Sequence, residues 1–254
     1  MSTLTLNPGR LTALGRSELT LLVRNRAALS VALLMPVLMV FVLRSTLDGA
    51  QGAAAVGEAT LTGGIGMVLL LVVYMNLVSA FVARREELVL KRLRTGEASD
   101  LEILGGTALP SAVLAVGQIA VLAVAGAAAL DVRMPLNPLL LLAAVLAGIV
   151  LLAGMSALTS AVTRTVESAG LTTLPLFLLT ALGSGLFVPL DRLPGPAASV
   201  CELLPLSGVM TLVRAGWSGG TDAAGLLGAA LTTLAWVVIT VFAVQRWFRW
   251  EPRR

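Results

Sequence analysis

Six long stretches without a charged residue divide this chain of 254 residues. They run over residues 27–43, 59–83, 103–130, 134–163, 168–190 and 223–245, and the first, of 17 residues, is the shortest. About 20 consecutive apolar residues are needed for a helix to cross the hydrocarbon core of a bilayer. The sequence therefore predicts an all-α integral membrane protein.

We expect six transmembrane helices, over residues 27–43, 61–83, 105–130, 138–163, 168–190 and 223–245, in one transmembrane domain that covers residues 1–254. Only 13% of the residues are charged and 57% are hydrophobic, which is outside the range of soluble domains. Asn137-Pro138 and Asp222 are suited to begin the fourth and sixth helices. The short first span can be extended by flanking arginines that snorkel to the interface.

The segment before the first span has a loosely amphipathic pattern. Its leucines are interrupted by polar residues, so no cleavable signal peptide is predicted. We expect a helix lying on the membrane surface. The polar positions assigned to it are Arg16, Glu18, Arg24 and Asn25.

The distribution of basic residues gives the orientation. With six spans, fourteen of the 18 Lys and Arg residues fall on one side and four on the other. Cytoplasmic loops carry the excess of positive charge. The sequence thus predicts that both termini and the loop of residues 84–102 are cytoplasmic. One lysine against 17 arginines, with abundant Ala, Leu and Gly, indicates a bacterial genome rich in GC.

The loop of residues 84–102 holds ten of the 32 charged residues, in the sequence RREELVLKRLRTGEASDLE. Glu87 and Lys91 have the spacing of a helical ion pair, and Gly96 is suited to end that helix. Ser99 and Glu102 form a capping-box pattern for a second helix. A simple turn needs far fewer residues, so the loop is predicted to have a function.

We interpret this loop as a docking surface for a cytoplasmic partner, because a helix this short needs packing to be stable. The alternative is a solvated hairpin that separates two spans. The residues assigned to docking are Arg84, Arg85, Glu86, Glu87, Lys91, Arg92, Leu93 and Arg94.

On the opposite side, residues 191–222 are too apolar for an ordinary loop. We expect a pair of short re-entrant or interfacial helices, with Pro205 at the start of the second. Pro189 and Arg214 are assigned to the same outer segment. The alternative is an aqueous loop with a few buried leucines.

Several kinds of chemistry are absent from the sequence. There is no histidine, a single cysteine and no P-loop, since the lone Lys91 does not follow a Gly-rich turn. We therefore expect no catalytic site, no metal and no bound nucleotide in this chain. The positive charge adjoins membrane spans, so no nucleic-acid binding is expected. Asn76 and Gln118 are the bulkiest polar residues within spans and the candidates for a substrate path.

Four stretches in order resemble the permease subunit of bacterial ABC-2 type transporters, which include drug, antibiotic and polysaccharide exporters. They are ELTLLVRNRAAL, REELVLKRLRTGEASDLEILGGTALP, TRTVESAG and GSGLFVPLDRLPG with LLPLSGVMTLVRAG. Members of this family often carry Gly-Thr where Leu88-Val89 stands here.

The resemblance implies export of a lipophilic drug, an antibiotic or a lipid-like substrate across the bacterial cytoplasmic membrane. It implies a separate ATPase that binds ATP and Mg²⁺, and a second permease copy, identical or related. It also implies that the 84–102 loop and the surface helix contact the ATPase. A membrane anchor or sensor of a similar assembly is the alternative function, while a membrane enzyme is disfavoured by the missing histidine.

Overall fold

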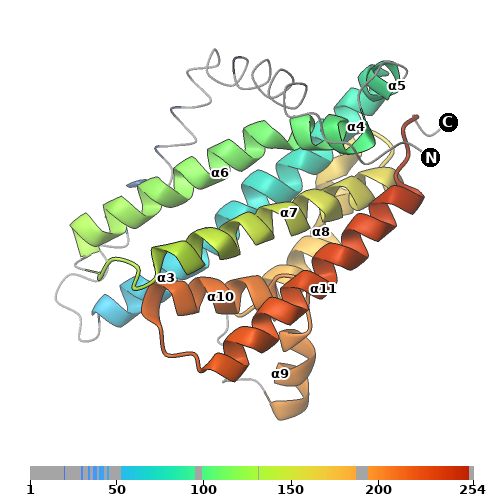
Figure 1. Cartoon of the computed structure of the whole chain (residues 1–254). Coiled ribbons are helices and arrows are strands. Elements are labelled where there is room, and N and C mark those ends of the chain that lie inside the picture. Colours follow the sequence, from blue (N-terminus) through green and yellow to red (C-terminus); the bar gives the residue numbers. More distant parts are fainter. Residues whose placement is uncertain are drawn as a thin grey trace.

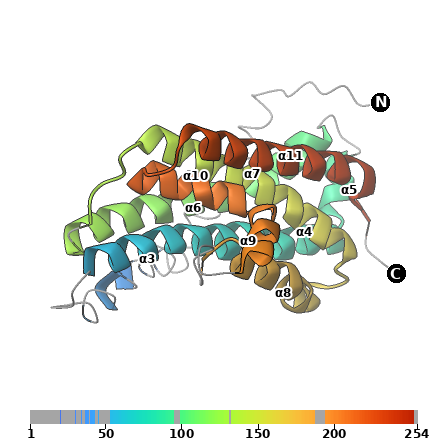
Figure 2. The same ribbon diagram turned by 90° about the horizontal axis from the view of Figure 1, so that it is seen from below.

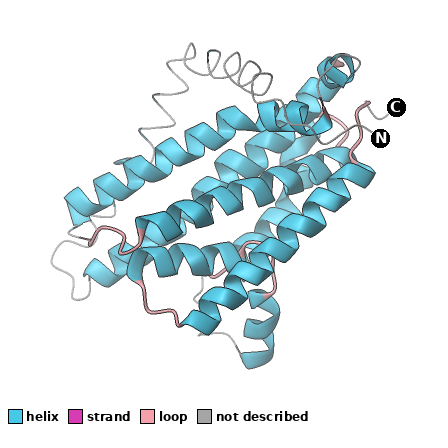
Figure 3. Cartoon of the chain, viewed as in Figure 1, coloured by secondary structure: helices cyan, strands magenta, loops and turns pink. Residues whose placement is uncertain are grey.

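The computed structural model describes residues 53–94, 99–130, 132–186 and 194–251, with single positions between residues 20 and 45. Helices joined by short loops make up this part of the chain, and it contains no strand (Figure 3). Most of the predicted first span lies outside the described residues. The same holds for Pro189 and for the predicted surface helix with Arg16, Glu18, Arg24 and Asn25.

Five helices in the described part are long and apolar enough to cross a membrane. The first is continuous and consists of α3 (Ala53–Val68), η1 (Leu69–Met75) and α4 (Asn76–Glu86); the others are α6 (Asp100–Leu130), α7 (Pro138–Val162), α8 (Val166–Gly183) and α11 (Ala223–Trp247). They correspond to the second to sixth predicted spans. The prediction of an all-α integral membrane protein is confirmed.

The helix starts read from the sequence are confirmed at atomic detail. The Asn137 side chain accepts a hydrogen bond from the backbone N–H of Leu140 at 3.0 Å, and Asp222 accepts one from Gly225 at 3.0 Å. Each satisfies a backbone donor that has no partner inside its helix. The capping side chains of Asn137 and Asp222 therefore fix the residues at which α7 and α11 begin.

Helix α7 is the element around which the others pack. It lies against α10 (Ser207–Ser218) and α11 on one side and against η1 and α4 on another (Figures 1 and 2). At Gly148 an added Cβ would lie 2.9 Å from the Val209 side chain and 3.1 Å from that of Leu69. Glycine thus permits α10 and η1 to approach α7 closely.

The middle of the first described span is π-helical over Leu69–Met75, which the hydrophobic pattern does not predict. A π turn departs from the usual hydrogen-bond pattern, and here α7 supplies an extra donor. The Ser156 hydroxyl lies between the Leu152 carbonyl of its own helix at 2.6 Å and the Tyr74 carbonyl at 3.0 Å, and the hydroxyls of Tyr74 and Thr159 are 3.1 Å apart. These bonds join the π-helical segment to α7.

The predicted pair of short helices before the last span is confirmed. α9 (Gly195–Glu202) and α10 meet at an angle of 90°, with Pro205 in the turn between them. The alternative of an aqueous loop is wrong, because α10 is buried over most of its length. Gly216 allows this burial, since an added Cβ would lie 2.8 Å from the backbone nitrogen of Leu141.

Candidate functional site

The charged loop forms a compact structure at one end of the bundle. α4 ends at Glu86, residues 87 and 88 form a turn, and α5 (Val89–Arg94) follows (Figure 1). Leu88 has a φ of 60°, in the left-handed region that favours glycine. The structure thus breaks the helix at Leu88, ahead of the predicted stop at Gly96, which lies outside the described residues.

This early break changes the predicted pairing of Lys91. Glu87 lies in the turn, outside α5, so the expected helical pair with Lys91 does not form within one helix. The Lys91 ammonium instead lies 2.8 Å from a carboxylate oxygen of Glu251, near the end of the chain. The pair is exposed, and exposed pairs contribute about 0–1 kcal/mol.

The capping box that opens α6 is confirmed. The backbone N–H of Ser99 donates to the Glu102 carboxylate at 2.8 Å, and the N–H of Glu102 donates to the Ser99 hydroxyl at 3.3 Å. Glu102 is only 1% exposed, so its carboxylate is part of the protein interior. The hydrogen bonds between Ser99 and Glu102 therefore fix the residue at which the loop ends and α6 begins.

Arg85 does not lie on the surface, contrary to its assignment as a docking residue. It is 1% exposed. Its guanidinium donates from Nη1 to the Ser160 carbonyl at 2.7 Å and from Nη2 to the Thr163 carbonyl at 2.5 Å. Both carbonyls belong to the C-terminal end of α7, where the helix dipole favours a cation. Arg85 therefore fastens the end of α4 to the end of α7.

The other predicted docking residues differ in exposure. Arg84 is half-buried and donates to the Thr107 hydroxyl at 3.3 Å, and Leu93 is half-buried. Arg94 ends α5, and its side chain lies outside the described residues. The side chains that face outward are Glu86, Glu87, Leu88, Lys91 and Arg92. These five residues are here called the exposed tip.

The end of the chain packs against this region, which the sequence analysis did not predict. The ring of Phe248 lies edge-on to Phe81 of α4, with centroids 6.1 Å apart, and Trp250 lies edge-on to Phe248 at 4.9 Å. Together with the contact of Lys91 and Glu251, these rings connect the segment after α11 to α4 and α5. The aromatic residues after the last span were the only signal in the sequence.

The two candidates for a substrate path have different surroundings. Asn76, at the start of α4, is exposed on the outside of the bundle, whereas Gln118 of α6 is buried. Their assignment to a substrate path stays a prediction. Among the described residues, no group of three His, Cys, Asp or Glu side chains could hold a metal ion.

The part of the bundle around α9 and α10 is joined by hydrogen bonds between α8 and α10. Both terminal nitrogens of Arg214 lie within 3.4 Å of the Ser184 carbonyl, and the Ser207 hydroxyl lies between the Cys201 carbonyl at 2.5 Å and the Gly183 carbonyl at 3.2 Å. Arg214 thus performs at this end what Arg85 performs at the other, since each satisfies carbonyls at a helix end. Arg214 is part of α10, and the outer location of that helix stays a prediction.

Comparison with known proteins identifies the family of the chain. None of the curated proteins matches the chain. The profile of the family described as ABC-2 type transporter matches residues 10–217, which include the charged loop, the turn between α7 and α8 and most of α10. The chain therefore belongs to the ABC-2 type transporter family.

Proposed function

We propose that this permease of an ABC transporter is an exporter driven by a separate ATPase that docks on the exposed tip. The observation that carries the proposal is the contrast within one loop. Arg85 is buried and bonded to α7, while Glu86, Glu87 and Arg92 point away from the bundle. A loop held firmly at its base and charged at its tip is suited to receive a partner and pass on its movement.

The route of that movement follows the hydrogen bonds of Arg85. The C-terminal end of α7 is followed by a short turn and then α8, whose first turn is capped by Thr165. A displacement of α5 reaches the end of α4, and through Arg85 it reaches the turn between α7 and α8. In this proposal ATP binding in the partner moves these helices together and opens the path for the substrate.

We place the protein in the bacterial cytoplasmic membrane, with the exposed tip and both termini in the cytoplasm. The fourteen to four division of basic residues supports this orientation. Cysteine labelling of intact cells tests it, in a Cys201→Ser background. Ser199→Cys, exposed on α9, should react from outside and Glu87→Cys should not. Ser207 is unsuitable for this test because it is buried.

The proposed cargo is a lipophilic drug, an antibiotic or a lipid-like molecule, and a second permease copy completes the path. The long helices are apolar, and α8 exposes Leu171, Leu179 and Leu182. Such a face suits either lipid or a second copy. The chain has no P-loop, so the purified permease alone should not hydrolyse ATP.

The decisive experiment measures co-purified ATPase and substrate efflux for charge reversals at the tip. Glu87→Lys and Arg92→Glu should lower both strongly, because losing one partner of an interfacial charge pair costs about 2–5 kcal/mol. Leu93→Asp should also lower both co-purified ATPase and efflux strongly, and Glu86→Ala should lower them less. Glu202→Lys is the matched control, since Glu202 is exposed on α9 near the other end.

Two outcomes separate the alternatives. If the reversals keep full ATPase binding and efflux, the loop is a solvated hairpin. If the native protein binds the ATPase and moves no substrate, the anchor or sensor function is correct.

A further inference from the structure

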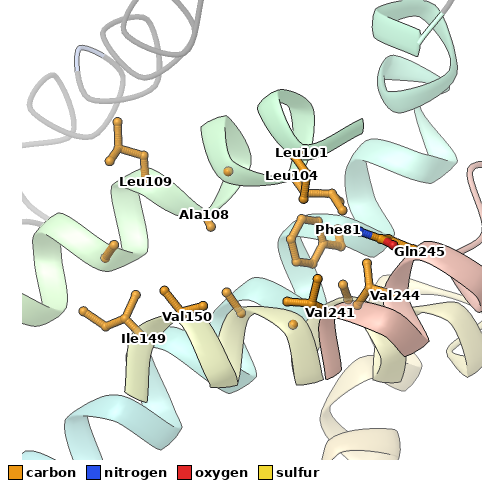
Figure 4. Close-up of a pocket in the computed structure, with 15 residues that line it drawn as sticks. Phe81, Leu101, Leu104, Ala108, Leu109, Ile149, Val150, Val241, Val244 and Gln245 are labelled. Atoms are coloured by element: carbon orange, nitrogen blue, oxygen red, sulfur yellow. The ribbon is translucent and has the colours of Figure 1, made fainter. Parts of the chain in front are cut away.

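A cavity of about 300 Å³ lies over α7, between α6 and α11. Figure 4 shows Phe81 and Gln245 at one end of the cavity and Leu109 and Ile149 at the other. The end with Phe81 faces α5, because Phe81 lies near the end of α4 and Gln245 near the end of α11. None of the residues that line it was assigned to a site from the sequence.

Small side chains create this space. α6 contributes Ala108 and Ala112, and α7 contributes Ala153 and Ala157 opposite them. Helices α6 and α11 each pack against α7, and the described helices leave the gap between the two open to the side. In a membrane such a lateral opening faces lipid chains, because the surrounding helices are long and apolar.

The length of the cavity matches one leaflet. Its α6 wall runs from Leu101 to Ala112, and eleven steps along a helix cover about 16 Å. Half of the hydrocarbon core measures about 15 Å. The cavity thus extends from the α5 end of the bundle to about its middle, in the direction in which a lipid chain lies.

The two ends of the cavity differ in polarity. Among the described residues that line the cavity, Gln245 alone has a polar side chain, and it lies at the α5 end. Beyond it, Arg246 and Arg249 are exposed at the end of α11. A molecule with an apolar tail and an anionic head would find its tail among apolar side chains and its head near arginines.

We propose that this cavity binds one acyl chain of an anionic glycerophospholipid from the leaflet at the α5 end. The headgroup lies near Arg246 and Arg249. The site is separate from the exposed tip, although Phe81 belongs both to its wall and to the aromatic contact with Phe248. Lipid in the cavity therefore supports the packing of the segment that follows α11.

The test uses phosphatidylglycerol with a photoreactive group midway along one acyl chain, added to the full-length permease in phosphatidylcholine nanodiscs. After illumination, mass spectrometry locates the labelled peptides. We expect labelling of residues 101–112 and 149–157 to exceed that of residues 227–238 on α11, whose side chains Leu227, Leu231 and Leu234 are exposed outside the cavity. Equal labelling of these segments would mean contact with bulk lipid only.

Two sets of variants sharpen the test. Ala153→Phe fills the cavity and should remove most of the labelling there, whereas Ala143→Phe, exposed on the same helix, should leave it unchanged. Ala112→Leu serves the same purpose if Ala153→Phe does not fold. Arg246→Gln with Arg249→Gln should abolish the preference over a phosphatidylcholine probe of the same design.

Unchanged labelling in both filling variants overturns the proposal, and so does equal labelling by the two probes in the native protein. Cross-links from residues 1–52 into the cavity in the lipid-depleted protein, with no lipid labelling there in nanodiscs, would show that the chain itself occupies the space.

Discussion

Two of the short helices that connect membrane spans, α5 and α10, differ in how deeply they are buried. α10 is enclosed by α7 and α11, and its glycines allow backbone contact. α5 has Leu90 fully buried, while Lys91 and Arg92 face outward. The comparison shows one connection built as part of the core and another built to present its surface. The following predictions test that distinction.

The largest effect is expected at Arg85, the base of the exposed connection. Arg85→Met removes two hydrogen bonds to carbonyls at the end of α7, although the Ser160 carbonyl keeps the backbone N–H of Thr163 as a donor at 3.2 Å. Hydrogen bonds to charged groups contribute about 1.5–3 kcal/mol each, so a loss of roughly 3 kcal/mol is expected. Thermal unfolding in detergent measures it. Arg92→Met is the control, and an equal loss there would refute the distinction.

The next largest loss of stability is expected from a substitution in α10. Gly208→Ala places a methyl group 2.6 Å from the carbonyl oxygen of Ala229. The backbone of α11 cannot move away cheaply, so a loss of about 1–3 kcal/mol is expected. Gly228→Ala makes the same change where nothing lies within 4 Å. It should raise the unfolding temperature, because alanine favours a helix by about 1 kcal/mol over glycine. Similar results for the two variants would show that α10 is not tightly enclosed.

At Leu88, one substitution is expected to raise the stability of the protein and to weaken ATPase binding. Leu88→Gly relieves a left-handed backbone and should stabilise the protein by about 1 kcal/mol. Leu88→Val, with a branched Cβ, should destabilise it. Leu88 is 40% exposed at the tip, so the glycine variant should also bind less ATPase. Unfolding temperature and co-purified ATPase are measured together, and unchanged ATPase binding would exclude Leu88 from the contact.

The smallest effect concerns the exposed pair of Lys91 and Glu251. Glu251→Gln should change the unfolding free energy by about 0–1 kcal/mol, and less at high salt. Trp250→Ala removes the ring packed on Phe248 and should cost more. If Glu251→Gln has the larger effect, the contact of the chain end with α5 is stronger than an exposed pair.

The features that the sequence predicted well depend on neighbours in the chain. The starts of α6, α7 and α11 follow from Ser99, Asn137 and Asp222, each of which bonds within three residues. The long apolar stretches identified five spans because composition alone decides that length. Local patterns were therefore sufficient for the outline of the fold.

The features that the sequence did not predict depend on contacts across the bundle. Arg85 resembles its charged neighbours in sequence, and only the position of Ser160 and Thr163 makes it a buried residue. The π-helical segment has its bonds to Ser156 and Thr159, more than 80 positions away. The same limit applied to Lys91, whose contact is at the far end of the chain.

The unequal lengths of the spans have a consequence for the bilayer itself. The 18 residues of α8 cover about 27 Å, less than a hydrocarbon core of about 30 Å, whereas the 32 residues of Ala55–Glu86 cover about 48 Å. A single flat membrane cannot fit both without tilt or local thinning. α9 and α10 follow the end of the short α8. The polar groups around Ser184 and Arg214 therefore lie closer to the middle of the bundle than the ends of the longer helices. The protein thus spans different thicknesses, small at α8 and large at the span Ala55–Glu86, to which lipids of different chain length must adapt.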